Sequence, residues 1–303
     1  MTDASDLEPA AAPTRDRIAT RALSATIAAL LVAGAVAAVV VSGSSAPKVV
    51  PLATIQAAAE SATAAKTATV EVTMTIESAS FNSTTRMIIR TDNVARTADF
   101  HTASDFGGTK RQQTEGRIAG DRFVLRVPAE LADISAGKPW LGANVPANAF
   151  GSPEDPMRTG GNLLDLLAGA NGAVDVVGTD KIRGVDTTHY RVEIDMVRAQ
   201  QANAAGQSAL GFPTPPVVEG PATRPADVWL DDEGRLRRMV MTFDDDGPGP
   251  EPGMRAQSEA YDYDKPFTVT MPPADQVHEV PTIGDAFTAL YTRYATDLRP
   301  PSP

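Results

Sequence analysis

The chain has no cysteine and only three histidines, and each shortage excludes a class of site. Without cysteine there can be no disulfide, no thiolate metal site, no cysteine nucleophile and no cysteine that carries a lipid. His101, His189 and His278 lie in three different segments and lack a second histidine at i+2 or i+4, so we expect no metal site. The formal net charge of -11 gives no electrostatic footprint for phosphates, which argues against a nucleic-acid partner.

Motifs of catalysis are also missing from the sequence. No Gly-rich phosphate loop, Ser-centred nucleophile motif or HExxH pattern is present. The acidic run of Asp244, Asp245 and Asp246 lacks the alternate spacing of a calcium loop, so we interpret it as a solvated hairpin tip. We therefore predict no catalytic residue, no cofactor and no enzymatic activity.

One feature that the sequence does contain is a long uncharged run, which begins at Ala22 and ends at Val41. Its length of about 20 residues matches the hydrocarbon core of a bilayer, so we predict a transmembrane anchor at residues 22–41. Three arginines precede the run and no positive charge follows it closely, which predicts a cytoplasmic tail at residues 1–21 and an extracytoplasmic remainder. The protein is thus expected at the cell membrane as a single-pass protein. A cleaved signal peptide is the alternative, because small residues follow the run.

Beyond the anchor, the sequence predicts a tether at residues 42–51, a folded domain at residues 52–280, and a terminal helix with a tail at residues 281–303. Within the domain most segments alternate apolar and polar residues with the period of a β-strand. Short spacings between these segments leave no room for crossover helices, so we expect antiparallel hairpins. The expected strands cover residues 70–76, 85–90, 109–117, 122–127, 174–182, 189–196, 227–243 as a hairpin, 258–264 and 266–271.

Helices are expected at residues 52–66, 162–170 and 283–298, where alanine-rich composition or apolar residues at helical spacing replace the alternation. Residues 128–160 contain five prolines and are predicted to be loop-like. Residues 200–225 are predicted to be an insertion with a short helical start and a Pro-rich run, which is either a lid or a loop. The predicted fold class is mainly β with helices (α+β).

The segment TTHYRVEIDM contains one of the three histidines. Tyr190, Val192 and Ile194 fall on the apolar side of the expected strand, and His189 falls on the polar side with the charged residues. Since no second histidine and no serine motif lies nearby, we predict that His189 points to solvent and has no catalytic or metal-binding role.

The apolar side of the expected sheet is larger than the helices available to cover it. The helix at residues 52–66 is narrow and alanine-rich, and the other two are short. Methionines such as Met74, Met87 and Met239 are flexible and polarisable enough to line a pocket for a variable apolar guest. Two interpretations stay open on the pattern alone, an ordinary core and a ligand cavity.

Five segments occur in the order seen in a known group of envelope proteins. They are KPWLGA (138–143), GNLLDLLAGA (161–170), GVDTTHYRVEID (184–195), DVWLDDEGRLRRM (227–239) and YDYDKPFTVTMPPADQV (261–277). In these segments the chain resembles the LppX, LprA, LprF and LprG group of actinobacterial envelope lipoproteins, which are similar to the lipoprotein carrier LolA. The resemblance implies an antiparallel half-barrel wrapped round helices, with a hydrophobic cavity for the acyl chains of lipids or lipoglycans, in a carrier and not an enzyme.

On this resemblance we expect a set of apolar strand residues to line the cavity. They are Val72, Met74, Met87, Ile89, Phe123, Leu125, Tyr190, Val192, Ile194, Met239 and Met241. The sequence departs from the group in lacking the lipid-carrying cysteine, so attachment would depend on the helix at residues 22–41. It also has a Pro-rich insertion at residues 211–225 and a helix after Pro281, either of which could fill the cavity, gate it or dock a partner.

The main alternative function is an envelope signalling or interaction module, because the regulator RseB, which binds an anti-sigma factor, resembles the same half-barrel. Such a module needs a surface for an envelope protein partner. The terminal helix and the Pro-rich insertion are the candidate elements for that surface.

Overall fold

The computed structural model describes residues 49–50, 52–55, 65–77, 82–106, 111–145, 167, 169–197, 223–243 and 253–297. Most of these residues belong to two meanders of consecutive antiparallel strands. The first contains β2 (Thr67–Glu77), β3 (Asn82–Asp92), β4 (Thr97–Phe106), β5 (Arg111–Ala119), β6 (Arg122–Arg126) and β7 (Trp140–Asn144). The second contains β8 (Ala170–Ile182), β9 (Val185–Asp195), β10 (Thr223–Asp231), β11 (Leu236–Phe243) and β12 (Gly253–Tyr261).

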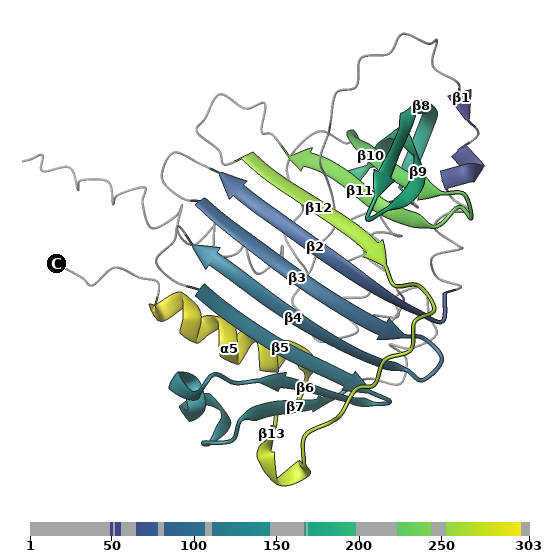
Figure 1. Ribbon diagram of the computed structural model, residues 1–303. Coiled ribbons are helices and arrows are strands. Elements are labelled where there is room, and N and C mark those ends of the chain that lie inside the picture. The colour runs from purple at the N-terminus through teal and green to yellow at the C-terminus, as the bar shows by residue number, and fades with distance from the viewer. Residues whose placement is uncertain are drawn as a thin grey trace, which may run out of the picture.

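The remaining described elements are short, apart from the terminal helix. They are β1 (Val49–Val50), the helical residues 52–55, two 3-10 helices at Ala129–Ser135 and Ala274–Gln276, β13 (Val277–Glu279) and α5 (Ile283–Asp297). All strands join one 13-stranded sheet in the order β1-β8-β9-β10-β11-β12-β2-β3-β4-β5-β6-β7-β13 (Figure 1). The strands pair antiparallel except for β13, which runs parallel to β7. The expected fold, mainly β and antiparallel with few helices, is confirmed.

Several expected elements are confirmed, with bounds that differ by a few residues. The strands expected at residues 70–76, 85–90, 122–127 and 174–182 are found, and the hairpin at residues 227–243 is formed by β10 and β11. The terminal helix begins at Ile283 as predicted. The helix expected at residues 52–66 is helical at residues 52–55, but it does not reach Lys66, because β2 begins at the next residue.

Two other expectations are wrong. The region 128–160, predicted to be a loop, contains a 3-10 helix and β7, because Trp140 opens a ladder with Arg126 directly after Pro139. The segment 266–271, predicted to be a strand, forms no ladder although its side chains alternate between half-buried and exposed. Prolines at both ends remove backbone donors, and Arg117 ties the segment to the sheet by donating to the Thr270 carbonyl oxygen.

Two chain boundaries also differ from expectation. Val49 and Val50, which we assigned to the tether, pair with Asp175 and Val174 of β8. Residues 223–225, which we assigned to the Pro-rich insertion, open β10 and pair with β9. Among the described residues, no helix combines the length and the apolar character needed to cross a membrane, and the anchor predicted at residues 22–41 lies outside them.

The central strands have one uncharged face, which we call the inner face, and α5 lies on it (Figure 1). Its positions are Ala68, Val70, Val72, Met74 and Ile76 on β2; Ser83, Thr85, Met87, Ile89 and Thr91 on β3; Ala98, Phe100, Thr102, Ser104 and Phe106 on β4; Gln112, Thr114, Gly116 and Ile118 on β5; and Met254, Ala256, Ser258 and Ala260 on β12. Along these five described strands, every Asp, Glu, Lys, Arg and His side chain belongs to the opposite, outer face. Alternation therefore divides the sheet into a neutral side and an ionic side.

Candidate functional site

The expected cavity residues fall into two clusters on the inner face. The larger, which we call the methionine cluster, contains nine of the eleven. They are Val72, Met74, Met87, Val192, Ile194, Met239 and Met241, which are buried, with Ile89 and Tyr190, which are partly buried against them. Residues from outside the two meanders, Ile55 and Leu167, belong to it as well. Strand pairing brings the methionines together, because Met241 lies opposite Ala256, which in turn lies opposite Met74.

The other two expected residues, Phe123 and Leu125, belong to a separate cluster that α5 covers, which we call the α5 cluster. Ile283, Ala286 and Leu290 of the helix are buried there. The Phe287 ring lies 6.1 Å from Phe100 and 5.7 Å from Phe123, measured between ring centroids. At this end of the sheet, the inner face is closed by side chains of the protein itself.

The start of α5 is fixed by its own sequence. The Asp285 backbone N–H donates to the Thr282 hydroxyl over 3.1 Å, and the Thr282 backbone N–H donates to the Asp285 carboxylate over 3.0 Å. This reciprocal pair is a capping box, which satisfies two backbone donors at the helix start. The cap directs Ile283 and Ala286 toward β6 and β7, so the helix joins the sheet with its apolar side inward.

Between the two clusters lies a group of buried hydroxyls, which we call the hydroxyl band. It consists of Ser83, Thr85, Thr102, Ser104 and Thr114 on β3, β4 and β5. Thr85 and Ser104 lie opposite each other and share a hydrogen bond of 2.9 Å. Thr102 lies opposite Met87 on one side and Thr114 on the other, so the band borders the methionine cluster directly.

Two buried hydroxyls of the inner face have no hydrogen-bond partner among the described residues. They are Thr102 in the band and Ser258 on β12. A buried hydroxyl without a partner costs about 1–3 kcal/mol relative to one that is bonded. Sequence reasoning missed this group, because the alternation test looked only for apolar residues. The available signal was serine and threonine at every second position, in STT on β3 and TAS on β4.

The prediction that His189 points to solvent is wrong, because this histidine is buried on the outer face. Strand β10 explains the difference, since it lies beside β9 and places Asp227 and Trp229 next to the histidine. The His189 Nε2 atom lies 2.7 Å from an Asp227 carboxylate oxygen, and the imidazole stacks on the Trp229 ring with centroids 4.1 Å apart. A single strand's alternation could not reveal neighbours from a strand 38 residues away in sequence.

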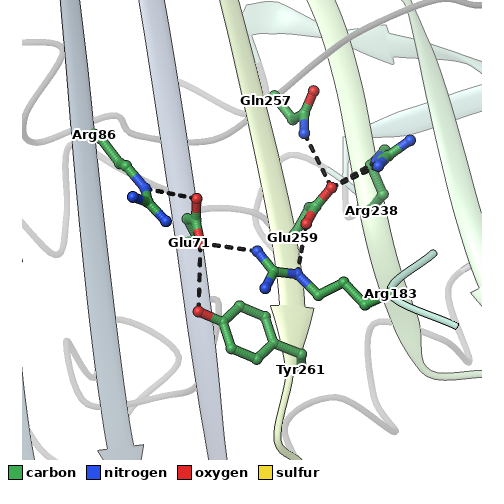
Figure 2. Close-up of polar contacts among 7 residues, drawn as sticks. All are labelled: Glu71, Arg86, Arg183, Arg238, Gln257, Glu259 and Tyr261. Atoms are coloured by element: carbon green, nitrogen blue, oxygen red, sulfur yellow. Dashed lines mark hydrogen bonds and ion pairs between the residues drawn. The ribbon is translucent and has the colours of Figure 1, made fainter. Parts of the chain in front are cut away.

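An ionic network on the outer face holds the β8–β9 hairpin against the centre of the sheet (Figure 2). Arg183, in the two-residue turn of that hairpin, donates to Glu259 over 2.7 Å and to Glu71 over 2.8 Å. Arg86 donates to the other Glu71 oxygen over 2.7 Å, and this hydrogen bond lowers the pKa of the Glu71 carboxyl despite its partial burial. Arg183 and Gly184 have positive φ angles of 49° and 82°, the combination that two-residue hairpins favour.

A second polar cluster closes the turn between β10 and β11. Asp231 accepts hydrogen bonds from the Arg235 backbone N–H over 2.9 Å and from the Arg237 guanidinium over 2.7 Å. Burial raises the pKa of Asp231, but these donors outweigh it and the pKa is lowered overall. In the part of the chain that the structure describes, no group of three His, Cys, Asp or Glu side chains could hold a metal ion.

Comparison with protein families finds no match, and comparison with curated proteins also finds none. Among solved structures, the chain is similar to LprF from Mycobacterium bovis, with 16% identity, a TM-score of 0.45, and coverage of 74% of this chain and 97% of that one. It is also similar to the lipoprotein LppX from Mycobacterium tuberculosis, with 18% identity, a TM-score of 0.40, and coverage of 72% and 97%.

A third similar structure is a putative outer membrane lipoprotein-sorting protein domain from Vibrio parahaemolyticus, with 11% identity and a TM-score of 0.22. It covers 75% of this chain and 97% of its own. LprF and LppX, the proteins whose group we named from the sequence segments, are thus found again among similar folds.

Proposed function

We propose that this protein is a membrane-tethered extracytoplasmic binder of lipids or lipoglycans, which accepts or presents acyl chains on its inner face. The observation that carries the proposal is the neutrality of that face. Five adjacent strands expose no charged side chain on this side, and their apolar residues include Met74 and Met87, against which Met239 and Met241 of the next strand, β11, are clustered. A soluble sheet with one such face must cover it with protein or with an apolar ligand.

The proposed site is the methionine cluster and the hydroxyl band, and it excludes the α5 cluster. Phe123 and Leu125, which we expected to line a cavity, already contact α5. The nine residues of the methionine cluster named above remain the proposed lining. Methionine suits this role because its unbranched thioether side chain adapts to guests of different shape.

The energetics favour exchange with a membrane over binding from water. Burying a methylene contributes about 0.8 kcal/mol, so a long acyl chain gains on the order of 13 kcal/mol on leaving water. A bilayer offers nearly the same gain. A tethered protein can therefore load and release chains with little net cost, and contacts to the polar part of the lipid decide the direction.

In the alternative function, an envelope module that binds a protein partner, the terminal helix is one of the candidate docking elements. In the structure the apolar residues Ile283, Ala286 and Leu290 are buried against the sheet. The helix therefore has its apolar side occupied, which favours the lipid-binding proposal. The Pro-rich residues 211–222 and the anchor at residues 22–41 lie outside the described residues.

The first test is native mass spectrometry with lipid extraction on the full chain purified from its host's membranes. We expect an acylated species bound at close to one equivalent. A clean apo mass, together with refusal of added phospholipid and lipoglycan, would contradict the proposal.

The second test replaces Val192, which is 1% exposed, with tryptophan. We expect Val192→Trp to reduce lipid loading with little change in Tm, because the added ring occupies space that the ligand would fill. Glu193→Trp is the matched control, since the next residue is exposed on the outer face and should leave loading unchanged. A sharp fall in Tm with Val192→Trp would indicate a closed, fully packed core instead, because overpacking a filled core is destabilising.

A further inference from the structure

We propose that the hydroxyl band is a subsite for the uncharged ester group of the bound lipid. This inference rests on the proposed function and narrows it to a chemical class, namely lipids whose acyl chains are joined through ester carbonyls. The observation behind it is a set of five buried hydroxyls on three adjacent strands, with Thr102 left without a partner among the described residues.

The position of the band suits a linkage between chain and headgroup. Thr102 lies opposite Met87, so a group bound at the Thr102 hydroxyl has the methionine cluster one strand away. Toward β6 the Phe100 ring blocks the other direction. It lies against Gly116, where an added Cβ atom would meet Phe100 at 2.1 Å, and it stacks with Phe123 at 6.4 Å. A polar group at the band would therefore send its chains toward the methionine cluster and away from α5.

The chemistry of the band selects neutral acceptors. A hydroxyl can donate one hydrogen bond, and the Thr102 hydroxyl has no described acceptor for its proton. An ester carbonyl would accept it. A phosphate or free carboxylate would find no cation on the strands around the band, because the described inner positions of β2, β3, β4, β5 and β12 carry no Lys, Arg or His. Burial of an unpaired charge at this point is strongly unfavourable.

Ser258 is a useful contrast to Thr102. It is also buried without a described partner, but its neighbours across the sheet are Val72 and Met239, so it is isolated from other hydroxyls. Strand spacing separates Ser258 from Thr102 by about 14 Å, too far for both to contact one ester group. A subsite at the band therefore predicts that only one of these two hydroxyls affects ester recognition.

The experiment is an internal competition on the full chain, read by native mass spectrometry. The protein is equilibrated with equal amounts of dipalmitoylglycerol and its dihexadecyl ether counterpart, which differ only in the two carbonyl groups. We expect wild type to favour the ester, and Thr102→Val to lower the ester-to-ether ratio about five-fold, the effect of one lost hydrogen bond. Thr102→Ser, which keeps the hydroxyl, should retain the preference.

Two further variants locate the effect. Thr84→Val changes the neighbouring exposed threonine on the outer face and should leave the ratio unchanged. Ser258→Ala should also leave it unchanged, whereas a loss equal to that of Thr102→Val would overturn the placement at the band. A ratio that does not move in Thr102→Val, while both lipids bind, would overturn the ester subsite and leave the proposed function standing. Failure of wild type to bind either lipid would overturn the proposed function itself.

Discussion

The α5 cluster and the methionine cluster share one face of one sheet, but they are built from different side chains. The α5 cluster contains a chain of aromatic contacts in which Phe100 and Phe123 of the sheet meet Phe287 of the capped helix, and Phe287 stacks on Tyr291. The methionine cluster has four buried methionines on β2, β3 and β11 among mainly aliphatic neighbours, with Trp229 and Tyr190 among its aromatic members. Flat rings in fixed stacks give a rigid core, whereas thioether chains repack at low cost. The same sheet can therefore combine a permanent core at one end with an adaptable surface at the other.

The largest loss of stability should come from a substitution in the α5 cluster. Leu290, on α5, is fully buried, and Leu290→Ala should lower the free energy of unfolding by about 3 kcal/mol because it leaves a cavity under the helix. Urea unfolding measures the change. The matched control is Thr288→Ala, an exposed position two residues earlier, which should change stability by less than about 0.5 kcal/mol.

Lipid loading sharpens this test. If the α5 cluster is core and not cavity, Leu290→Ala should still load lipid below its unfolding transition. Loss of loading in a folded Leu290→Ala protein would show that the two clusters form one site.

Acid is expected to lower the stability of the protein by a smaller amount, and the loss should occur in the half of the sheet that contains the methionine cluster. The folded-state pKa of Glu71 is lowered from its ordinary value of 4.5, so its stabilisation is complete above pH 4.5 and is lost as the pH falls through the folded pKa. Arg183 links this carboxylate to the β8–β9 hairpin, as Figure 2 shows. We expect Glu71→Gln to cost at most about 1 kcal/mol at pH 7, because the pair is partly exposed, and the cost should shrink as the pH falls below 4.5 and the carboxylate of the folded wild type becomes protonated.

Hydrogen exchange locates the change. Amides of β8 and β9 should lose protection in Glu71→Gln at pH 7, while those of β6 and β7 should not. Equal loss at both ends would contradict the idea that the network serves only the methionine half.

Met239→Leu should also change stability only modestly, because it nearly conserves volume at a fully buried position. We expect less than about 1.5 kcal/mol of destabilisation, together with a narrower range of acyl chains bound, since the branched side chain adapts less well. Competition among lipids of different chain length measures the range. An unchanged range in Met239→Leu would mean that methionine flexibility at this position does not shape the site.

Sequence alone gave the antiparallel class, most strands and the terminal helix, because these depend on local alternation and spacing. It missed β4 entirely. The segment TADFHTASDF lacks alternating large apolar residues, and it is a strand because β3 and β5 pair with it on both sides. Missing β4 also hid the hydroxyl band, whose central residue is Thr102. His189 was misassigned for the same reason, since its partners Asp227 and Trp229 come from another strand.

The division into two clusters could not be predicted either. Phe123 and Leu125 alternate like the other expected lining residues, and only the position of α5 separates them. The opposite error occurred at residues 266–271, where alternation is present but the segment pairs with none of the described strands. Local pattern reports which side of a strand is apolar, and the rest of the chain decides what lies against it.

The strand order has a consequence for how the chain folds. Each meander is made of neighbours in sequence, and among the described strands the ladder between them is that of β12 with β2, between residues near 257 and residues near 73. Contacts between such distant segments form slowly, because the entropy cost of closing a long loop comes before the contacts contribute any favourable free energy. Until then β2 and β12 are both unpaired edges with one uncharged side, the kind of surface that associates with other chains. We expect the protein to be most prone to aggregation during this interval. Formation of the ladder between β12 and β2 removes both exposed edges and with them this tendency to aggregate.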